Sequence, residues 1–230
     1  MSFEADVSKE LAKRTSLRPG LCILDVASGL GGSGCFLATE HHCKITGIDF
    51  IQEYIGVANT LVDLSRLNDR VNFCKNSALG MPFYGSAFDV VWSEHAQMNI
   101  ADKRAFYAEI GRVLKPGGRL AFHDICESSG DPLHFSVPWA EDGSISFLAL
   151  PETVRDLLGE VGFKIVVWED KTCQSLEWYA AVAKKFKPCG PPPLGLYLLM
   201  GNTAKGKFEN MIRNLQEGRI VVVQAVAKKD

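Results

Sequence analysis

Short apolar runs recur along this chain, and polar or turn-forming residues separate them. Each run has the length of a strand, and the run at 88–92 is apolar almost throughout, as in a central parallel strand that is buried on both faces. The strands that this pattern predicts are 22–27, 45–49, 71–75, 88–92, 119–124, 163–168 and 219–227.

Between these runs, apolar residues return every three or four positions, which is the spacing of a helix with one buried face. Strands that alternate with helices predict a doubly wound α/β sheet. Breakers mark several helix ends, such as Pro19-Gly20 and Gly162. The expected helices are 5–15, 33–39, 52–67, 103–114, 151–161, 174–186 and 196–215.

The second half of the chain differs in composition and is less regular. Segment 127–147 is irregular and rich in Pro, Ser, Asp and aromatic residues, and a loop of this length in a compact domain usually has a function. Segment 174–215 is helical and precedes the last strand, so we interpret it as an insertion or lid. We expect a single domain over 1–230, with a short N-terminal helix within 1–20 and an active-site loop at 127–147.

Composition narrows the classes of partner. A net charge of −2 and a pI near 6.2 argue against nucleic acid as a main partner, because phosphate binding normally leaves a basic patch. No apolar run approaches a membrane span, and no signal peptide opens the sequence. The seven cysteines are scattered without a C-x-x-C pair, which is typical of a reduced, cytoplasmic protein. His41 and His42 lack a third ligand, so no metal is expected.

A glycine-rich turn follows the first predicted strand, and an acidic residue ends the second. The turn, 27–32, reads Ala-Ser-Gly-Leu-Gly-Gly, and Asp49 lies 20 residues after Gly29. Glycine lets a ligand approach the backbone, the following helix offers free N–H groups, and a carboxylate accepts hydrogen bonds from a ribose diol. This spacing predicts a nucleotide-type cofactor.

An acid on the strand before the turn separates two kinds of cofactor. A dinucleotide site would place a pyrophosphate close to Asp25, which its charge disfavours. With Gly29 and Gly31, Asp25 instead resembles motif I, D/E-x-G-x-G-x-G, of class I S-adenosylmethionine (SAM) methyltransferases, although Ala27 stands at the first glycine.

The resemblance extends beyond the turn. Stretches 88–93, 112–120 and 157–163 resemble the fourth strand of the family, its helix–turn–strand into the fifth, and its lead into the sixth. The resemblance implies a seven-stranded Rossmann-like sheet, mostly parallel with the last strand antiparallel. Segment 92–103 is most similar to small-molecule methyltransferases that act on sarcosine and dimethylglycine, phosphoethanolamine or tocopherol-type phenols. The expected reaction is in-line transfer of a methyl group to N or O of a small acceptor.

The resemblance also implies roles for individual residues on the cofactor side. Asp25, Ala27, Gly29 and Gly31 would hold the methionine part of SAM. The remaining expected contacts are Asp49 with the ribose, Phe50 with the adenine ring, Ser77 and Ala78 with the adenine amine, and Ser93 with the sulfonium.

The acceptor side is expected where the fourth and fifth strands end. His95 is the first candidate for a general base, because an imidazole titrates near working pH. Glu94 would offset a cationic acceptor, and Asn99 is expected to cap the helix near residue 102. Other candidates are His123 as a catalytic group, and Gln97, Asp124, His134, Phe135 and Trp139 as substrate contacts.

Alternatives to this function stay open. Asp25 disfavours a nicotinamide-dependent oxidoreductase. The short N-terminus keeps open the alternative of a non-catalytic methyltransferase-like subunit. Relatives of this type carry a longer segment before motif I, which folds over the cofactor. Three readings follow: an open site, a site closed by a partner chain in an oligomer, or a truncated member of the family with weak activity. Our hypothesis is that 127–147 and 174–215 replace the missing lid.

Overall fold

The computed structural model describes residues 3–128, 130–189 and 197–230, and it contains one seven-stranded sheet. The strand order is β3-β2-β1-β4-β5-β7-β6, and β7 runs antiparallel to both of its neighbours while the other pairs are parallel. This confirms the doubly wound α/β class and its antiparallel last strand. The strands are β1 (Cys22–Val26), β2 (Lys44–Asp49), β3 (Val71–Lys75), β4 (Phe88–Glu94), β5 (Leu114–Glu127), β6 (Phe163–Asp170) and β7 (Ile220–Lys229).

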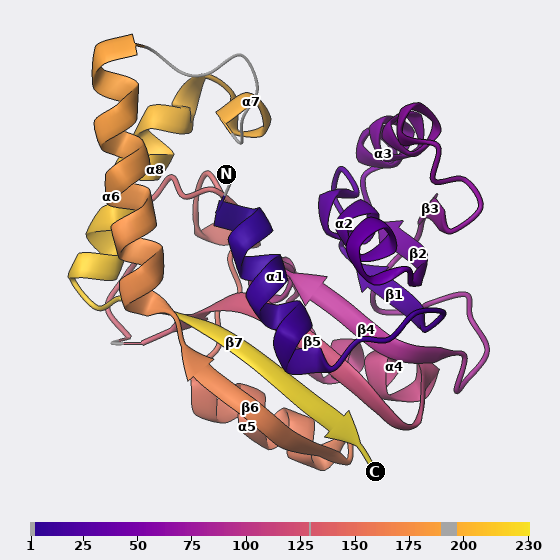
Figure 1. The fold of residues 1–230 in the computed structure, drawn as a ribbon. Coiled ribbons are helices and arrows are strands. Elements are labelled where there is room, and N and C mark those ends of the chain that lie inside the picture. The colour runs from indigo at the N-terminus through magenta and orange to yellow at the C-terminus, as the bar shows by residue number, and fades with distance from the viewer. Residues whose placement is uncertain (1–2, 129, 190–196) are drawn as a thin grey trace.

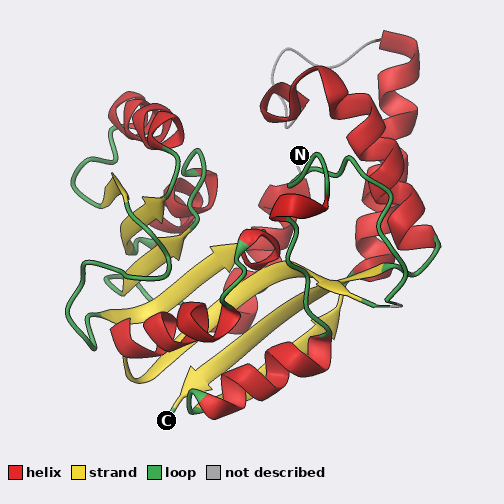
Figure 2. Cartoon of the chain, turned by 180° about the vertical axis from the view of Figure 1, so that it is seen from behind, coloured by secondary structure: helices red, strands yellow, loops and turns green. Residues whose placement is uncertain are grey.

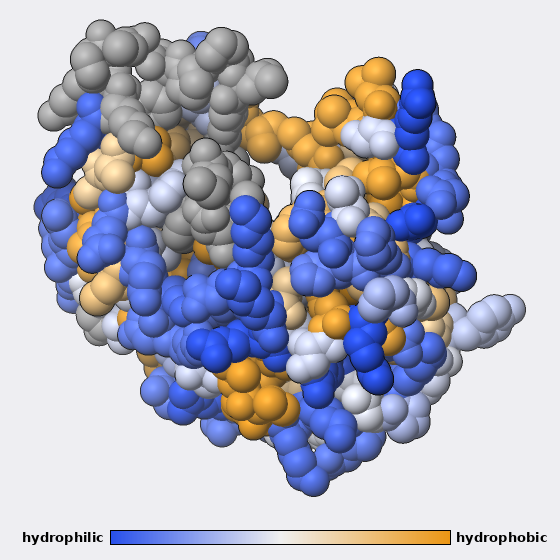
Figure 3. Space-filling model, in the orientation of Figure 1, coloured by the Kyte–Doolittle hydropathy of each residue, from blue (hydrophilic) through white to orange (hydrophobic). Residues whose placement is uncertain are grey.

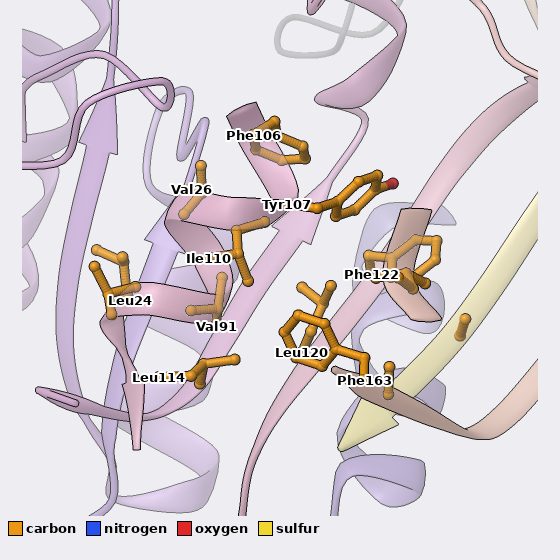
Figure 4. Packing of buried hydrophobic residues seen from close by; sticks show 14 of the residues in the cluster. Leu24, Val26, Val91, Phe106, Tyr107, Ile110, Leu114, Leu120, Phe122 and Phe163 are labelled. Atoms are coloured by element: carbon orange, nitrogen blue, oxygen red, sulfur yellow. The ribbon is translucent and has the colours of Figure 1, made fainter. Parts of the chain in front are cut away.

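Helices cover both faces of the sheet (Figures 1 and 2). On one face, apolar side chains of α1 (Phe3–Thr15), α2 (Gly32–His41) and α3 (Gln52–Ser65) pack against the sheet. On the other face, α4 (Lys103–Val113) and α5 (Pro151–Glu160) do the same. Figure 4 shows how Leu24, Val91 and Leu120 of three adjacent strands meet Phe106 and Ile110 of α4. These two cores fix the carboxyl ends of β1, β2, β4 and β5 beside one another.

A helical unit follows β6 and precedes β7 in the sequence. It lies at the end of the sheet where β5 terminates (Figure 1). It contains α6 (Thr172–Cys189), α7 (Tyr197–Met200) and α8 (Ala204–Gln216). Its apolar side chains form a third cluster with the start of β7, the end of β5 and the turn after β4. Members of this cluster include Met98, Ile125, Tyr179, Phe208, Met211 and Val222.

The two largest differences from the expected elements concern β5 and the helix before the last strand. β5 begins at Leu114 instead of 119, because Leu114 already pairs with Phe88 before the register shifts. The helix expected at 196–215 is divided: α7 ends at Met200, a 3₁₀ turn covers Gly201–Thr203, and Gly201 has a φ of +68° that an α-helix cannot contain. Residue 196, the expected start, lies outside the described residues.

The part of the chain that the structure describes contains no helix with both the length and the apolar character of a membrane crossing.

Candidate cofactor and acceptor site

The glycine-rich turn has a backbone shape that its sequence only partly suits. Gly29 and Gly31 have φ of +54° and +80°, and a Cβ on Gly31 would lie 2.6 Å from the ring of Phe73. That contact allows only glycine at this position. Ala27 has a φ of +59°, which is unfavourable for a residue with a Cβ. Phe73, on β3, was not a candidate in the sequence, although its ring packs against the turn at Gly31.

Asp49 ties the end of β2 to the turn. Its Oδ2 accepts a hydrogen bond from the Gly29 amide at 2.9 Å, and its Oδ1 accepts one from the Ile51 amide at 2.9 Å. Each carboxylate oxygen can accept a further bond. The neighbouring Phe50 side chain is 73% exposed, so its ring is available for stacking, with the Lys75 ammonium 5.8 Å from the ring centroid.

Ser77 and Ala78 lie in the loop that follows β3. The Asn76 amide donates to the Asp49 carbonyl at 3.0 Å, which brings this loop beside the end of β2. The Ser77 hydroxyl accepts from the Leu79 amide at 3.1 Å, and both Ser77 and Ala78 are half-buried. The loop therefore borders the same corner of the sheet as Phe50.

Asp25 is a buried carboxyl group at the end of β1, and its Oδ2 has no hydrogen-bond partner among the described residues. Burial, then the nearby charges of Glu94 and Asp49, raise the pKa of Asp25 to about 8. The hydroxyl groups of Ser28 and Ser93 are also buried and have no hydrogen-bond partner within the described part of the chain. Buried polar atoms normally have partners, so this set fits a ligand that brings donors and positive charge, as the amino-acid part of SAM does.

Glu94, at the end of β4, contacts α1 and α2. The Ser8 hydroxyl lies 3.0 Å from both of its carboxylate oxygens, and the Ser33 hydroxyl donates to Oε2. The N-terminal helix is also held by ion pairs, because Lys171 contacts Glu10 at 2.7 Å. These contacts place α1 over this end of the sheet.

His95 and His123 lie together where β4 and β5 end. Their ring centroids are 5.2 Å apart at an interplanar angle of 81°, and the His95 amide donates to the His123 carbonyl at 2.9 Å. Burial lowers the pKa of His95 to about 4, and burial also holds the pKa of His123 well below its usual value, so both imidazoles are neutral at pH 7. His123 is fully buried while His95 is partly exposed, so a ligand can reach only His95 directly. His95 has a φ of +55°, an uncommon conformation for a residue with a Cβ.

Asp124 and Gln97 organise the turn after β4. Asp124 accepts hydrogen bonds from the Ala96 and Gln97 amides at 3.1 and 3.0 Å, and burial raises its pKa to about 6. The Gln97 side chain contacts Tyr107 and Cys126. Both side chains are buried, so the structure gives them supporting contacts beside His95.

Lys103 secures the same turn and was not a candidate in the sequence. Its ammonium donates to the carbonyls of Gln97 and Ile100 at 2.9 and 2.8 Å, and to the carbonyl of Phe147. The expected cap Asn99 is wrong: Asp102 caps α4 by accepting from Ala105, and Asn99 donates to loop carbonyls instead. Turn and loop are thus joined as one unit.

The three expected contacts from segment 127–147 make their described interactions with α8 and with the loop itself. His134 Nε2 is 2.7 Å from Glu217 Oε2 near the end of α8, and its backbone bonds with Asn214. Trp139 packs on the edge of the third cluster, and its indole donates to Ser146 at 3.0 Å. Phe135 is half-buried, with its ring near Gly143.

His41 and His42 are at the far end of α2. The His42 ring lies 3.1 Å from Arg70, and the His41 ring meets the edge of Phe36.

Comparisons with known proteins agree with this geometry. A family of methyltransferase domains matches residues 17–179. An O-methyltransferase of Aspergillus nomiae is 31% identical over 173 residues, which are 71% of this chain and 73% of that protein. A phosphoethanolamine N-methyltransferase of Triticum aestivum is 29% identical over 172 residues, 75% of this chain but only 34% of the relative.

Solved structures share the fold over nearly the whole chain. A sarcosine dimethylglycine methyltransferase from Galdieria sulphuraria superposes with a TM-score of 0.79 at 20% identity and covers 99% of this chain and 85% of that one. A [4+2]-cyclase superposes with a TM-score of 0.78 at 24% identity, covering 97% and 80%. These likenesses establish the fold, which serves more than one reaction. The match over residues 17–179 and the 31% identity place the chain in the methyltransferase domain family, among the class I S-adenosylmethionine-dependent enzymes.

Proposed function

We propose that this protein transfers a methyl group from SAM to a hydroxyl oxygen or amine nitrogen of a small-molecule acceptor. The observation that carries the proposal is that two features meet at the carboxyl ends of the central strands. Asp25, the glycine turn and Asp49 form a cofactor cradle, and His95 lies just beyond it at the end of β4.

The chain would hold the cofactor through the residues that line this cradle. Asp25 and the turn around Ala27, Gly29 and Gly31 suit its amino-acid part, and the spare acceptor capacity of Asp49 suits the ribose. The exposed ring of Phe50, with Ser77 and Ala78 beside it, suits adenine, and Ser93 lies toward the sulfur. When bound, SAM supplies an activated methyl group.

The chain's contribution is alignment and removal of a proton. Alignment alone is worth about 7–11 kcal/mol when the reacting atoms are held in a near-attack geometry. His95 is neutral at pH 7, so its imidazole can accept the acceptor's proton, and the ring of His123 packs edge-on against it. Glu94 is beside this pair but is held by Ser8 and Ser33.

The buried lysine ammonium groups are already bound by protein groups, and this favours an acceptor without negative charge. Lys103 is bound by three carbonyl groups, Lys171 by Glu10 and Glu169, and Lys207 by Glu141. In the described ranges, each of these buried ammonium groups is thus already neutralised or solvated by protein. The O-methyltransferase names of several relatives favour a hydroxyl acceptor.

A turnover screen tests the proposal. The purified chain is incubated with SAM and a panel of phenols, alcohols and amines, and mass spectrometry measures S-adenosylhomocysteine and methylated products. We expect equal amounts of both with at least one uncharged hydroxyl compound, and a loss of about 10²-fold or more in His95→Gln. Binding of SAM without any turnover across the panel would instead support a non-catalytic subunit.

A further inference from the structure

The backbone of His95 is in an unfavourable conformation at the point where the imidazole must be aimed. Its φ of +55° lies in the left-handed region, and a residue with a Cβ stays there only when neighbouring contacts hold it. His95 follows the last residue of β4, and β4 runs toward the hollow between α3 and the helical unit in the orientation that Figures 1 and 3 share. The contacts that hold this backbone therefore also decide where the ring points.

Three consecutive backbone amides of the turn after β4 are bound by two neighbouring residues of β5. The His95 amide donates to the carbonyl of His123 at 2.9 Å. The amides of Ala96 and Gln97 both donate to Oδ2 of Asp124, at 3.1 and 3.0 Å. The first bond uses a backbone carbonyl, which any residue type would offer. The other two depend on the side chain of Asp124.

The Asp124 carboxylate is itself fixed. It is 1% exposed, and its other oxygen, Oδ1, accepts from the Ile125 amide at 3.1 Å. Burial raises the pKa of Asp124 to about 6, while the amide bonds and the charge of Lys103 oppose this rise, so the group is mostly ionised at pH 7. Hydrogen bonds to an ionised acceptor are stronger than bonds to a neutral one. Asp124 is thus a rigid anchor for the turn.

The other cation-based anchor of this turn acts farther from the histidine. Lys103 binds carbonyl groups of the turn and of the loop 127–147, and the first of these in sequence is the carbonyl of Gln97. Asp124 instead binds the amide of the residue directly after His95. The two anchors therefore divide the turn, and Asp124 holds the part that carries the imidazole.

We propose that Asp124 is a positioning residue that holds the turn 95–97 so that the His95 imidazole stays in place for proton transfer. The inference rests on the proposed function, in which His95 is the general base. Asp124 takes no proton from the acceptor, because both of its oxygens are directed to backbone amides. It acts through His95.

NMR titration of the histidine rings tests the proposal without an acceptor. The chain has five histidines, and the signal that is lost in His95→Gln identifies His95. Burial lowers the pKa of His95 to about 4, so its ring signals should not move between pH 5.5 and 8 in the wild type. In Asp124→Ala the released turn exposes the ring, and we expect it to titrate with a midpoint near the ordinary value of about 6.5.

The direction of this shift separates movement of the ring from a direct charge effect. Removal of a nearby negative charge would lower the pKa of His95, whereas exposure of the ring to water raises it. Asp124→Asn keeps an oxygen that can accept the amides of Ala96 and Gln97. It should therefore leave His95 untitrated in this range. Asp124→Ala should still bind SAM with wild-type affinity, because the proposed cofactor contacts lie on other residues.

Asp89→Ala is the matched control. Asp89 is also an acid that accepts a backbone amide, from Cys22 at 2.9 Å, but it lies at the opposite end of β4. Its loss should leave the His95 signals unchanged. A His95 ring that stays untitrated in folded Asp124→Ala would overturn the proposal, as would the same titration in Asp124→Asn or in Asp89→Ala.

Hydrogen exchange in the wild type decides the matter if thermal unfolding shows that Asp124→Ala does not fold. The amides of Ala96 and Gln97 should exchange about tenfold or more slowly than in an unstructured peptide, because Asp124 binds them. Unprotected amides would overturn the proposal. A chain that bound no SAM would remove the proposed function, but it would leave these ring and amide signals as they are, so the two failures are distinguishable.

Discussion

The carboxylate of Asp49 accepts a hydrogen bond from the backbone amide of Gly29 at 2.9 Å. This contact joins the acid that ends β2 to the turn that follows β1, and the two residues are 20 positions apart in sequence. The spacing of the motif therefore has a direct structural meaning. The acid positions the turn and keeps spare acceptor capacity for a ribose.

The packing of Gly31 on Phe73 predicts an intolerant position. Gly31→Ala should destabilise the protein by about 2–4 kcal/mol, from a strained backbone and from overlap with the ring. Gly29→Ala has the strain without the overlap, since nothing lies within 4 Å of its Cβ, and should cost about 1–2 kcal/mol. Urea unfolding measures both. Phe73→Leu should recover part of the loss in the Gly31→Ala background, and equal costs for the two glycine variants would contradict the packing argument.

The backbone conformation of Ala27 predicts that glycine at this position stabilises the protein. Its φ of +59° is a conformation that glycine adopts without cost, so Ala27→Gly should stabilise the fold by about 0.5–1 kcal/mol. Ala105→Gly, inside α4, should destabilise by about 1 kcal/mol through lost helix propensity. Chemical denaturation of the two variants should thus give opposite signs. A loss of stability in Ala27→Gly would show that its methyl group makes contacts worth more than the strain.

Asp25 predicts a pH dependence of stability. Its pKa is raised from 3.8 to about 8 on folding, so between these values the native state keeps a proton that the unfolded state releases. Stability from this group therefore falls as pH rises through that window. Relative to wild type, Asp25→Asn should become progressively more stable from pH 5 to pH 8. Unfolding curves at pH 5, 6.5 and 8 give the difference, and a constant difference would mean that Asp25 is ionised throughout.

Lys103 predicts a link between stability and the loop 127–147. Replacement by methionine leaves the carbonyls of Gln97, Ile100 and Phe147 without their donor, at a cost of about 1–3 kcal/mol. Limited proteolysis should then cut 127–147 faster in Lys103→Met. Lys44→Met, at an exposed position that starts β2, serves as the control. Unchanged cleavage in Lys103→Met would show that other contacts hold the loop.

The parts of this site that sequence could predict are those encoded locally. Asp25, Gly31 and Asp49 follow from strand, turn and strand in order, because the fold places consecutive strand ends side by side. The strand pattern likewise predicted the sheet, and its errors fell at boundaries such as Leu114, where pairing with Phe88 extends β5.

Contacts between distant segments could not be predicted. The Ser8 hydroxyl contacts Glu94 although the two residues are 86 positions apart in sequence, and no local pattern marks Ser8 as its partner. Phe73 looked like an ordinary core residue, although a glycine inside β2, Gly47, was a signal that a bulky neighbour lies close. Asn99 was expected to cap a helix because its residue type suits caps, but Asp102 lies at the position that can.

The central claim is that the corner formed by Asp25, Gly29, Gly31 and Asp49 binds SAM. Calorimetric titration of the wild-type chain and of Asp49→Ala with SAM tests it most directly, with thermal unfolding to verify that the variant is folded. We expect micromolar binding by the wild type, and a loss of about 1–3 kcal/mol, or roughly five- to 150-fold, in the variant. Absence of binding by the folded wild-type chain, or equal affinity in the two, would contradict the account.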